Sequence, residues 1–195
     1  MQDLLVGFLQ SSSMVSIAVL SWLALYFLLT LWVFFYRFIS LTYYCKDENR
    51  SLKMLISGEL HFPASISSIQ GIIGEGANRE IMHIWKHQIL QKASKGLTLL
   101  GIVASTAPFI GLFGTVVEIL EAFFQLGGGG KVSFDLVAPI ISKALVATAA
   151  GILTAIPAYS FHLVLKRKLY DLSVTLQMEL DYLLSRQEIQ REIRF

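Results

Sequence analysis

The chain has 195 residues, of which 54% are hydrophobic and only 15% are charged. A soluble domain carries about 25% charged residues, so a water-soluble fold is disfavoured. The 16 Lys and Arg residues against 14 Asp and Glu leave a net charge of only +2, which predicts no nucleic-acid partner. The composition therefore indicates a membrane protein.

Three uncharged, apolar runs are long enough to cross a bilayer as helices, since about 20 residues suffice. They extend from Leu4 to Tyr36, from Gly96 to Val117 and from Ala144 to Leu165. No Lys or Arg precedes Arg37, so the first run lacks the basic start of a cleaved signal peptide and is expected to stay in the protein. The predicted fold is an all-α integral membrane protein with three transmembrane helices.

The Lys and Arg residues predict the orientation. Residues 37–95 hold eight of them and residues 166–195 hold six, so the positive-inside rule assigns both segments to the cytoplasm and the N-terminus to the opposite side. We therefore divide the chain into an outer N-terminus with the first span (1–37), a cytoplasmic helical loop (38–95), the second and third spans (96–165) and a cytoplasmic C-terminal helix (166–195).

Two apolar stripes predict that long helices extend into the cytoplasm. One follows the third span and consists of Leu169, Leu172, Leu176, Leu180 and Leu183. The other follows Asn78, a candidate N-cap, and consists of Ile81, Ile84, Trp85 and Ile89; it is expected to run straight into the second span. The stripes are expected to pack against each other or against neighbouring subunits.

Residues 127–130, all glycine, predict a turn between the second and third spans.

No motif makes a case for an enzyme, a metal site or a cofactor. Gly130 and Lys131 follow a glycine run, but Val132 stands where a phosphate-binding loop needs Ser or Thr. His83 and His87 have metal-ligand spacing, yet the glutamate of a zinc-dependent hydrolase helix is absent, so a wet helix face is favoured. The single cysteine, Cys45, cannot form an internal disulfide.

Small and hydroxyl side chains form stripes along the second and third spans. The second span aligns Gly111, Thr115 and Glu118, with Gly114 beside them, and the third aligns Ala144, Thr148, Gly151 and Ala155. Such stripes let membrane helices pack closely, and Pro108 and Pro157 bend them. The alternative is that the hydroxyls line a polar pathway. Threonine does not ionise, so if protons cross here, another chain is expected to supply the acid.

The second span resembles the corresponding helix of the MotA/TolQ/ExbB family in the stretch ASTAPFIGLFGTV, residues 104–116. The third span is similar in ATAAG (147–151) and AIPA (155–158). Three spans and a modest loop favour the ExbB/TolQ branch. The resemblance implies a bacterial inner-membrane subunit with a periplasmic N-terminus, in a pentameric ring around single-span ExbD- or TolR-like helices that carry the proton on an aspartate. It assigns the pore-lining threonines to Thr115 and Thr148.

The chain departs from the family pattern in its charges. Lys143 stands where the family has a glutamate, and Glu118 and Glu121 replace uncharged or weakly basic residues. Lys143 either pairs with one of these carboxylates or extends its ammonium group towards the membrane surface.

The function we expect is a proton-channel subunit that drives work at the outer envelope. The alternatives are a structural membrane scaffold without conduction and, less favoured, a solute transporter, because no paired repeat is visible.

Overall fold

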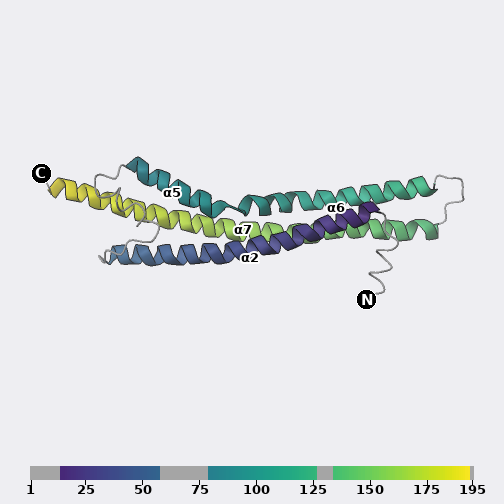
Figure 1. Ribbon diagram of the computed structural model, residues 1–195, viewed down its shortest axis with the longest axis horizontal. Helices are drawn as coiled ribbons and strands as arrows, with labels where there is room; N and C mark the ends of the chain where they lie inside the picture. Colours follow the sequence, from purple (N-terminus) through teal and green to yellow (C-terminus); the bar gives the residue numbers. More distant parts are fainter. Residues whose placement is uncertain (1–13, 58–78, 127–133, 194–195) are drawn as a thin grey trace. The chain divides into compact units, whose positions relative to one another are not determined.

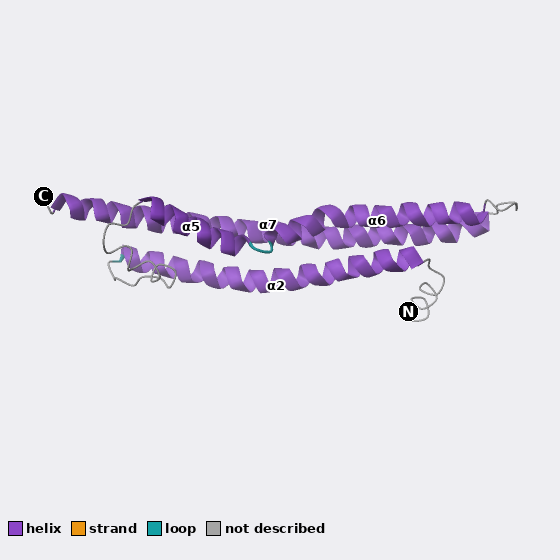
Figure 2. Ribbon diagram, turned by 45° about the horizontal axis from the view of Figure 1, so that its top comes forward, coloured by secondary structure: helices purple, strands orange, loops and turns teal. Residues whose placement is uncertain are grey.

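The computed structural model describes residues 14–57, 79–126 and 134–193. They form four helices and, within these ranges, no strand: α2 (Met14–Ile56), α5 (Arg79–Ser94), α6 (Leu97–Leu126) and α7 (Phe134–Ile193) (Figure 1; Figure 2). The predicted all-α class is confirmed. Three helices contain candidate spans, at Met14–Met54, Leu97–Phe124 and Val137–Ser185. The proposed cap at Asn78 and the glycine turn at 127–130 lie outside the described residues.

Two of the helices are far longer than a bilayer requires. α7 has 60 residues and α2 has 43, which correspond to about 90 Å and 65 Å at a rise of 1.5 Å per residue. The hydrocarbon core is only about 30 Å thick. We therefore expect the uncharged stretches up to Tyr36 in α2 and from Ala144 to Leu165 in α7 to span the membrane, and both helices are long enough to continue beyond it.

The chain divides into two compact units, each with parts of α2 and α7. The first unit contains α2 up to Phe34 together with Thr98–His162, and the second contains Phe35–Leu97 together with α7 from Leu163 onward. In the first unit α6 lies antiparallel beside the first half of α7 (Figure 1). Its core consists of four alanines and three larger side chains, two of them from α2 and one from α6: Val19, Leu23, Val103, Ala107, Ala147, Ala155 and Ala158.

The second unit packs α5 and the later part of α2 against the later part of α7. The predicted leucine stripe is buried at Leu172, Leu176 and Leu180. Met82 of α5 packs against Leu180, and the ammonium group of Lys86 donates to the side-chain oxygen of Gln177 over 2.6 Å. The sequence left open whether the leucine stripe packs within the chain or against neighbouring subunits. In the structure it packs against α5 of its own chain.

The structure corrects two expectations for α5. First, α5 does not run into α6: the helix stops at Ser94, and Gly96 adopts a left-handed φ of 92° before α6 begins. Glycine takes this conformation without the steric cost that a Cβ adds, and it commonly terminates helices in this way. Second, Ile84 is 59% exposed, and Met82, which the predicted stripe omitted, is buried in its place.

Candidate functional site

The second and third spans touch through their backbones. A Cβ built on Gly111 would lie 2.7 Å from the carbonyl oxygen of Ala147, and one on Gly151 would lie 2.7 Å from that of Ala107. Real Cβ atoms do not approach a carbonyl oxygen so closely, so only glycine fits at either position. A Cβ built on Gly114, one turn further along α6, would lie 3.0 Å from the side chain of Val19 and 3.1 Å from that of Ala147. The glycines thus bring the two helix axes close together.

This close approach brings Thr115 of α6 and Thr148 of α7 into direct hydrogen bonding through their hydroxyl groups. The Thr115 hydroxyl also reaches the carbonyl oxygens of Gly111 at 3.1 Å and Ala144 at 3.3 Å, and the Thr148 hydroxyl reaches that of Gly111 at 3.4 Å. One threonine can donate to the other, whose own proton goes to a carbonyl. Both side chains are only partly buried, so their oxygen lone pairs can still accept a hydrogen bond from another molecule.

The three charged residues singled out in the sequence lie on one side of this hydroxyl pair. Glu118 is one turn beyond Thr115 on α6 and is only 8% exposed, and its Oε2 has no hydrogen-bond partner among the described residues. Because the helices are antiparallel and the two threonines touch, Lys143 on α7 extends from the pair in the same direction. Glu121 and Lys143 are partly buried. The charge pair itself stays a prediction.

The alanines of the third-span stripe lie in the same interface. Ala144 is fully buried and Ala155 is 8% exposed. Ala144 lies beside Thr115, whose hydroxyl binds its carbonyl oxygen. The small side chains therefore lie where the two spans meet, and the glycines and hydroxyls of this interface form the candidate site.

Sequence reasoning missed two groups of buried polar side chains. Thr30 of α2 is fully buried in the first unit, and its hydroxyl has no partner among the described residues. In the second unit Glu48 and Glu179 are 3% and 0% exposed. The signal was present for Glu179, because it falls between Leu176 and Leu183 at the spacing of the leucine stripe. A carboxylate at such a position points inward.

No group of three or more His, Cys, Asp or Glu side chains that could hold a metal ion occurs within the described ranges. His83 and His87 belong to α5, whereas His61, the other histidine near them in the sequence, lies outside those ranges.

Comparisons with known proteins agree with these features. The profile of the MotA/TolQ/ExbB proton channel family matches residues 62–178. The ExbB-like 1 protein of Helicobacter pylori is 52% identical over 188 residues, which are 95% of this chain and 100% of that protein. The biopolymer transport protein ExbB of Neisseria gonorrhoeae is 51% identical over 71 residues, or 36% of this chain and 32% of the relative.

A TolQ protein also matches. The Tol-Pal system protein TolQ of Haemophilus influenzae is 42% identical over 77 residues, which are 40% of this chain and 34% of that protein. The two shorter matches carry both names of the branch, and the profile spans the touching segments of α6 and α7. With its three apolar helices, the chain belongs to the MotA/TolQ/ExbB proton channel family, as an ExbB/TolQ-like, multi-pass protein of the inner membrane with a proton-channel role in energy transduction.

Proposed function

We propose that this chain is the channel subunit of a motor that couples inward proton flow to work at the outer envelope. The observation that supports this most directly is the Thr115–Thr148 hydroxyl pair between two apolar spans. Polar groups inside a membrane are costly and commonly mark ion pathways. A unit charge that crosses about 100 mV releases about 2.3 kcal/mol, so successive protons can drive a conformational step.

The proton-carrying acid is proposed to come from a second chain. α6 has no charged residue from Leu97 to Val117, and α7 has no Asp, Glu, Lys or Arg from Ala144 to Leu165. Threonine hydroxyls can only donate and accept hydrogen bonds. A single-span partner of the ExbD/TolR type, with an aspartate in its span, would supply the carboxylate, and the threonine hydroxyls would hydrogen-bond to it as it gains and loses a proton.

The proposed assembly is a ring of five copies around the partner helices, with the N-terminus in the periplasm. The first unit exposes large apolar side chains such as Phe109 and Leu153, at 70% and 69%. In a membrane such side chains contact lipid or neighbouring subunits. The surface of a single chain is therefore compatible with lateral association, and the excess of Lys and Arg in residues 37–95 and 166–195 supports the orientation.

The rival function is a scaffold without conduction, and one observation favours it. Because each threonine hydroxyl already finds a partner in the other or in a backbone carbonyl, the pair needs no visiting group to be satisfied. Both readings predict close packing of α6 and α7. They differ in whether the hydroxyls matter for proton movement, and that difference can be measured.

The test uses two single variants, Thr115→Val and Thr148→Val. Valine keeps the shape of threonine and removes the hydroxyl. The loss of one hydrogen bond costs only about 0.5–1.5 kcal/mol, so the ring should still assemble. We expect each variant to lose partner-dependent proton uptake into vesicles at least about tenfold, while native mass spectrometry shows an unchanged assembly.

Thr154→Val is the matched control. Thr154 is buried in the same helix, but its hydroxyl donates to the carbonyl oxygen of Ala150 on its own helix, at 2.9 Å. This variant should keep its proton uptake. Wild-type uptake in both Thr115→Val and Thr148→Val, with intact assembly, would exclude the proposed role of the pair and leave the scaffold.

A further inference from the structure

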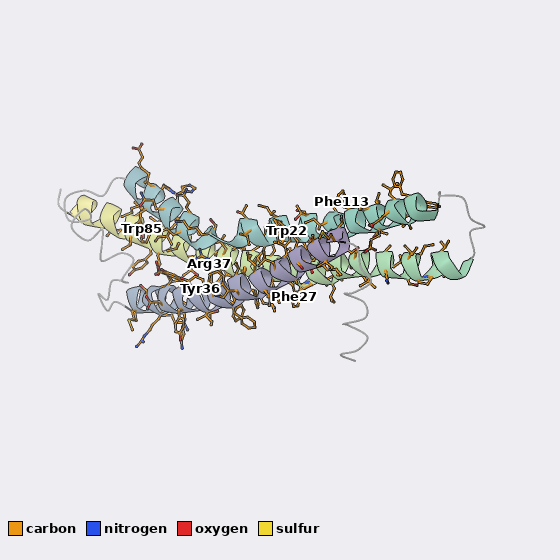
Figure 3. All side chains as sticks on the ribbon, turned by 45° about the vertical axis from the view of Figure 1, so that its right-hand side comes forward. Trp22, Phe27, Tyr36, Arg37, Trp85 and Phe113 are labelled. Carbon is orange, nitrogen blue, oxygen red and sulfur yellow. The ribbon has the colours of Figure 1, made fainter. Side chains whose placement is uncertain are left out.

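A cavity of about 380 Å³ lies in the second unit between α2 and α5. Its polar and aromatic lining comprises Tyr36, Arg37, Ser40 and Tyr44 of α2 and Trp85, Gln88 and Lys92 of α5. Figure 3 labels three of these residues, Tyr36, Arg37 and Trp85. They contribute two aromatic rings and a guanidinium group to the lining of the cavity. The volume lies within the range of about 300–1,000 Å³ that is typical of small-molecule sites.

The charges of the cavity favour an anion. Arg37 and Lys92 line it, and none of its lining residues is acidic. Neither cation forms an ion pair with a carboxylate in the part of the chain that the structure describes. The Arg37 guanidinium lies 5.9 Å from the centre of the Tyr36 ring, a weak contact that leaves its N–H donors available. Two unneutralised cations and neighbouring hydroxyl and amide groups suit a phosphate.

The position of the two cations relative to the predicted spans indicates that the phosphate belongs to a lipid headgroup. Arg37 is the first charge after the uncharged run that ends at Tyr36, and Lys92 precedes the second uncharged run, which begins at Gly96. Both cations thus lie at the ends of spans, where phospholipid headgroups lie. Tyrosine and tryptophan concentrate at this level of a membrane. The lining also includes the apolar side chains of Leu41 and Ile89, which can contact the start of an acyl chain.

We propose that this cavity binds the phosphodiester headgroup of an anionic phospholipid. The guanidinium of Arg37 forms paired hydrogen bonds to the phosphate oxygens, and the Lys92 ammonium adds a second positive charge. Basic side chains just beyond the cytoplasmic ends of membrane helices attract such anionic headgroups. This site is separate from the Thr115–Thr148 pair, so the inference does not depend on the proposed proton pathway.

The experiment measures lipid binding to the purified full-length protein by native mass spectrometry. The probes are dioleoylphosphatidylglycerol, which is anionic, and dioleoylphosphatidylcholine, which has a phosphate but no net charge. We expect preferential retention of phosphatidylglycerol. Arg37→Gln and Lys92→Gln should each weaken it about fivefold, the effect of losing one cation near a membrane surface. Arg37→Lys keeps the positive charge, so it should weaken phosphatidylglycerol binding less than Arg37→Gln does.

Lys53→Gln is the matched control, because Lys53 is an exposed lysine on α2 that does not line the cavity. Circular dichroism verifies that each variant folds. Equal phosphatidylglycerol binding by the Arg37→Gln/Lys92→Gln double variant and by Lys53→Gln would overturn the site. Displacement of the lipid by millimolar inorganic phosphate or glycerol 3-phosphate would overturn the lipid as its ligand, since a headgroup anchored by its acyl chains resists such competition.

Discussion

Glu179 is a carboxylate in an environment that disfavours its charge. It lies about 20 Å beyond Leu165 along α7 at the helical rise, and therefore outside the membrane-spanning segment. Its side chain is fully buried, and neither carboxylate oxygen has a hydrogen-bond partner among the described residues. Burial, and secondly the nearby Glu48 carboxylate, raise the pKa of Glu179 to about 8, with Asp47 adding to the rise.

The raised pKa predicts that the protein loses stability as pH rises. The folded protein keeps a proton on Glu179 up to a pKa of about 8, whereas the unfolded chain releases it near the ordinary value of 4.5. The stabilisation is therefore complete below the lower value and declines as pH approaches the upper one. We expect the melting temperature in detergent to fall between pH 5 and 8, with a change in unfolding free energy on the order of a few kcal/mol.

Glu179→Gln should remove most of this decline and raise the melting temperature at pH 8. Asp181→Asn is the control, because Asp181 is an exposed carboxylate on the same helix. It should keep the wild-type pH profile. A wild-type profile in Glu179→Gln would show that another group causes the pH dependence.

Lys143 supports a second prediction at the scale of residues. The Thr115–Thr148 contact sets the register of α6 against α7. At the helical rise, Glu118 lies about 4.5 Å from that contact along α6 and Lys143 about 7.5 Å along α7. A height difference of roughly 3 Å permits a pair, within one subunit or between neighbours.

The proposed pair is tested by exchanging charges. Lys143→Glu should impair assembly or proton uptake, because it adds a like charge near Glu118 and Glu121, whereas Lys143→Arg should be tolerated. Adding Glu118→Lys or Glu121→Lys should restore part of the loss. Strictly additive losses in both double variants would argue against pairing and favour an ammonium group that extends to the membrane surface.

At the scale of helices, glycine has opposite consequences at two positions. Alanine favours a helix over glycine by about 1 kcal/mol. At Gly101 a new Cβ would meet only the His162 ring at 3.5 Å, an ordinary contact, so Gly101→Ala should leave stability unchanged or raise it. At Gly151 the Cβ would meet a backbone oxygen at 2.7 Å. Gly151→Ala should therefore destabilise the protein by about 1–3 kcal/mol.

Thermal unfolding in detergent compares the two variants. Both substitutions add one methyl group to an apolar span, so helix propensity and hydrophobicity change equally. Equal melting temperatures would contradict the close contact of α6 with α7. A selective loss in Gly151→Ala, accompanied by lower proton uptake, would link helix separation to the hydroxyl pair.

The helices were largely predictable, because uncharged length and the spacing of leucines are properties of a single segment. The spans and the stripe from Leu172 to Leu180 follow from such local patterns. The end of α5 was also encoded locally, since Gly96 is a typical helix terminator, but the apolar pattern on both sides obscured it. Ile84 was misplaced because periodicity does not say which of several apolar residues will meet the neighbouring helix.

The sites were only partly predictable. Thr115 and Thr148 came from matching stripes and a family resemblance, yet their direct hydrogen bond depends on the register of two helices. The approach of Glu48 to Glu179 and the cavity between α2 and α5 involve residues far apart in the chain. Nothing in a single segment specifies such pairings, which arise only when the helices pack.

At the scale of the whole molecule, both units take helices from distant parts of the chain. The boundaries between them fall at Phe34, Leu97 and His162, so the chain passes from one unit to the other three times. Cutting the chain after Leu97 would divide both units, and cutting it after Phe34 or His162 would remove one segment from the first or the second unit. The two units are therefore structural divisions and not separable domains.

This sharing of helices has a consequence for biosynthesis. A ribosome makes α7 after α2, α5 and α6, and α7 contributes to both units. Until α7 emerges, α6 is in the membrane with the glycine face around Gly111 unpartnered, and the carboxylate of Glu48 is not yet close to that of Glu179. The part of α7 up to His162 completes the first unit and the part from Leu163 onward completes the second, so both units depend on the helix that is made last.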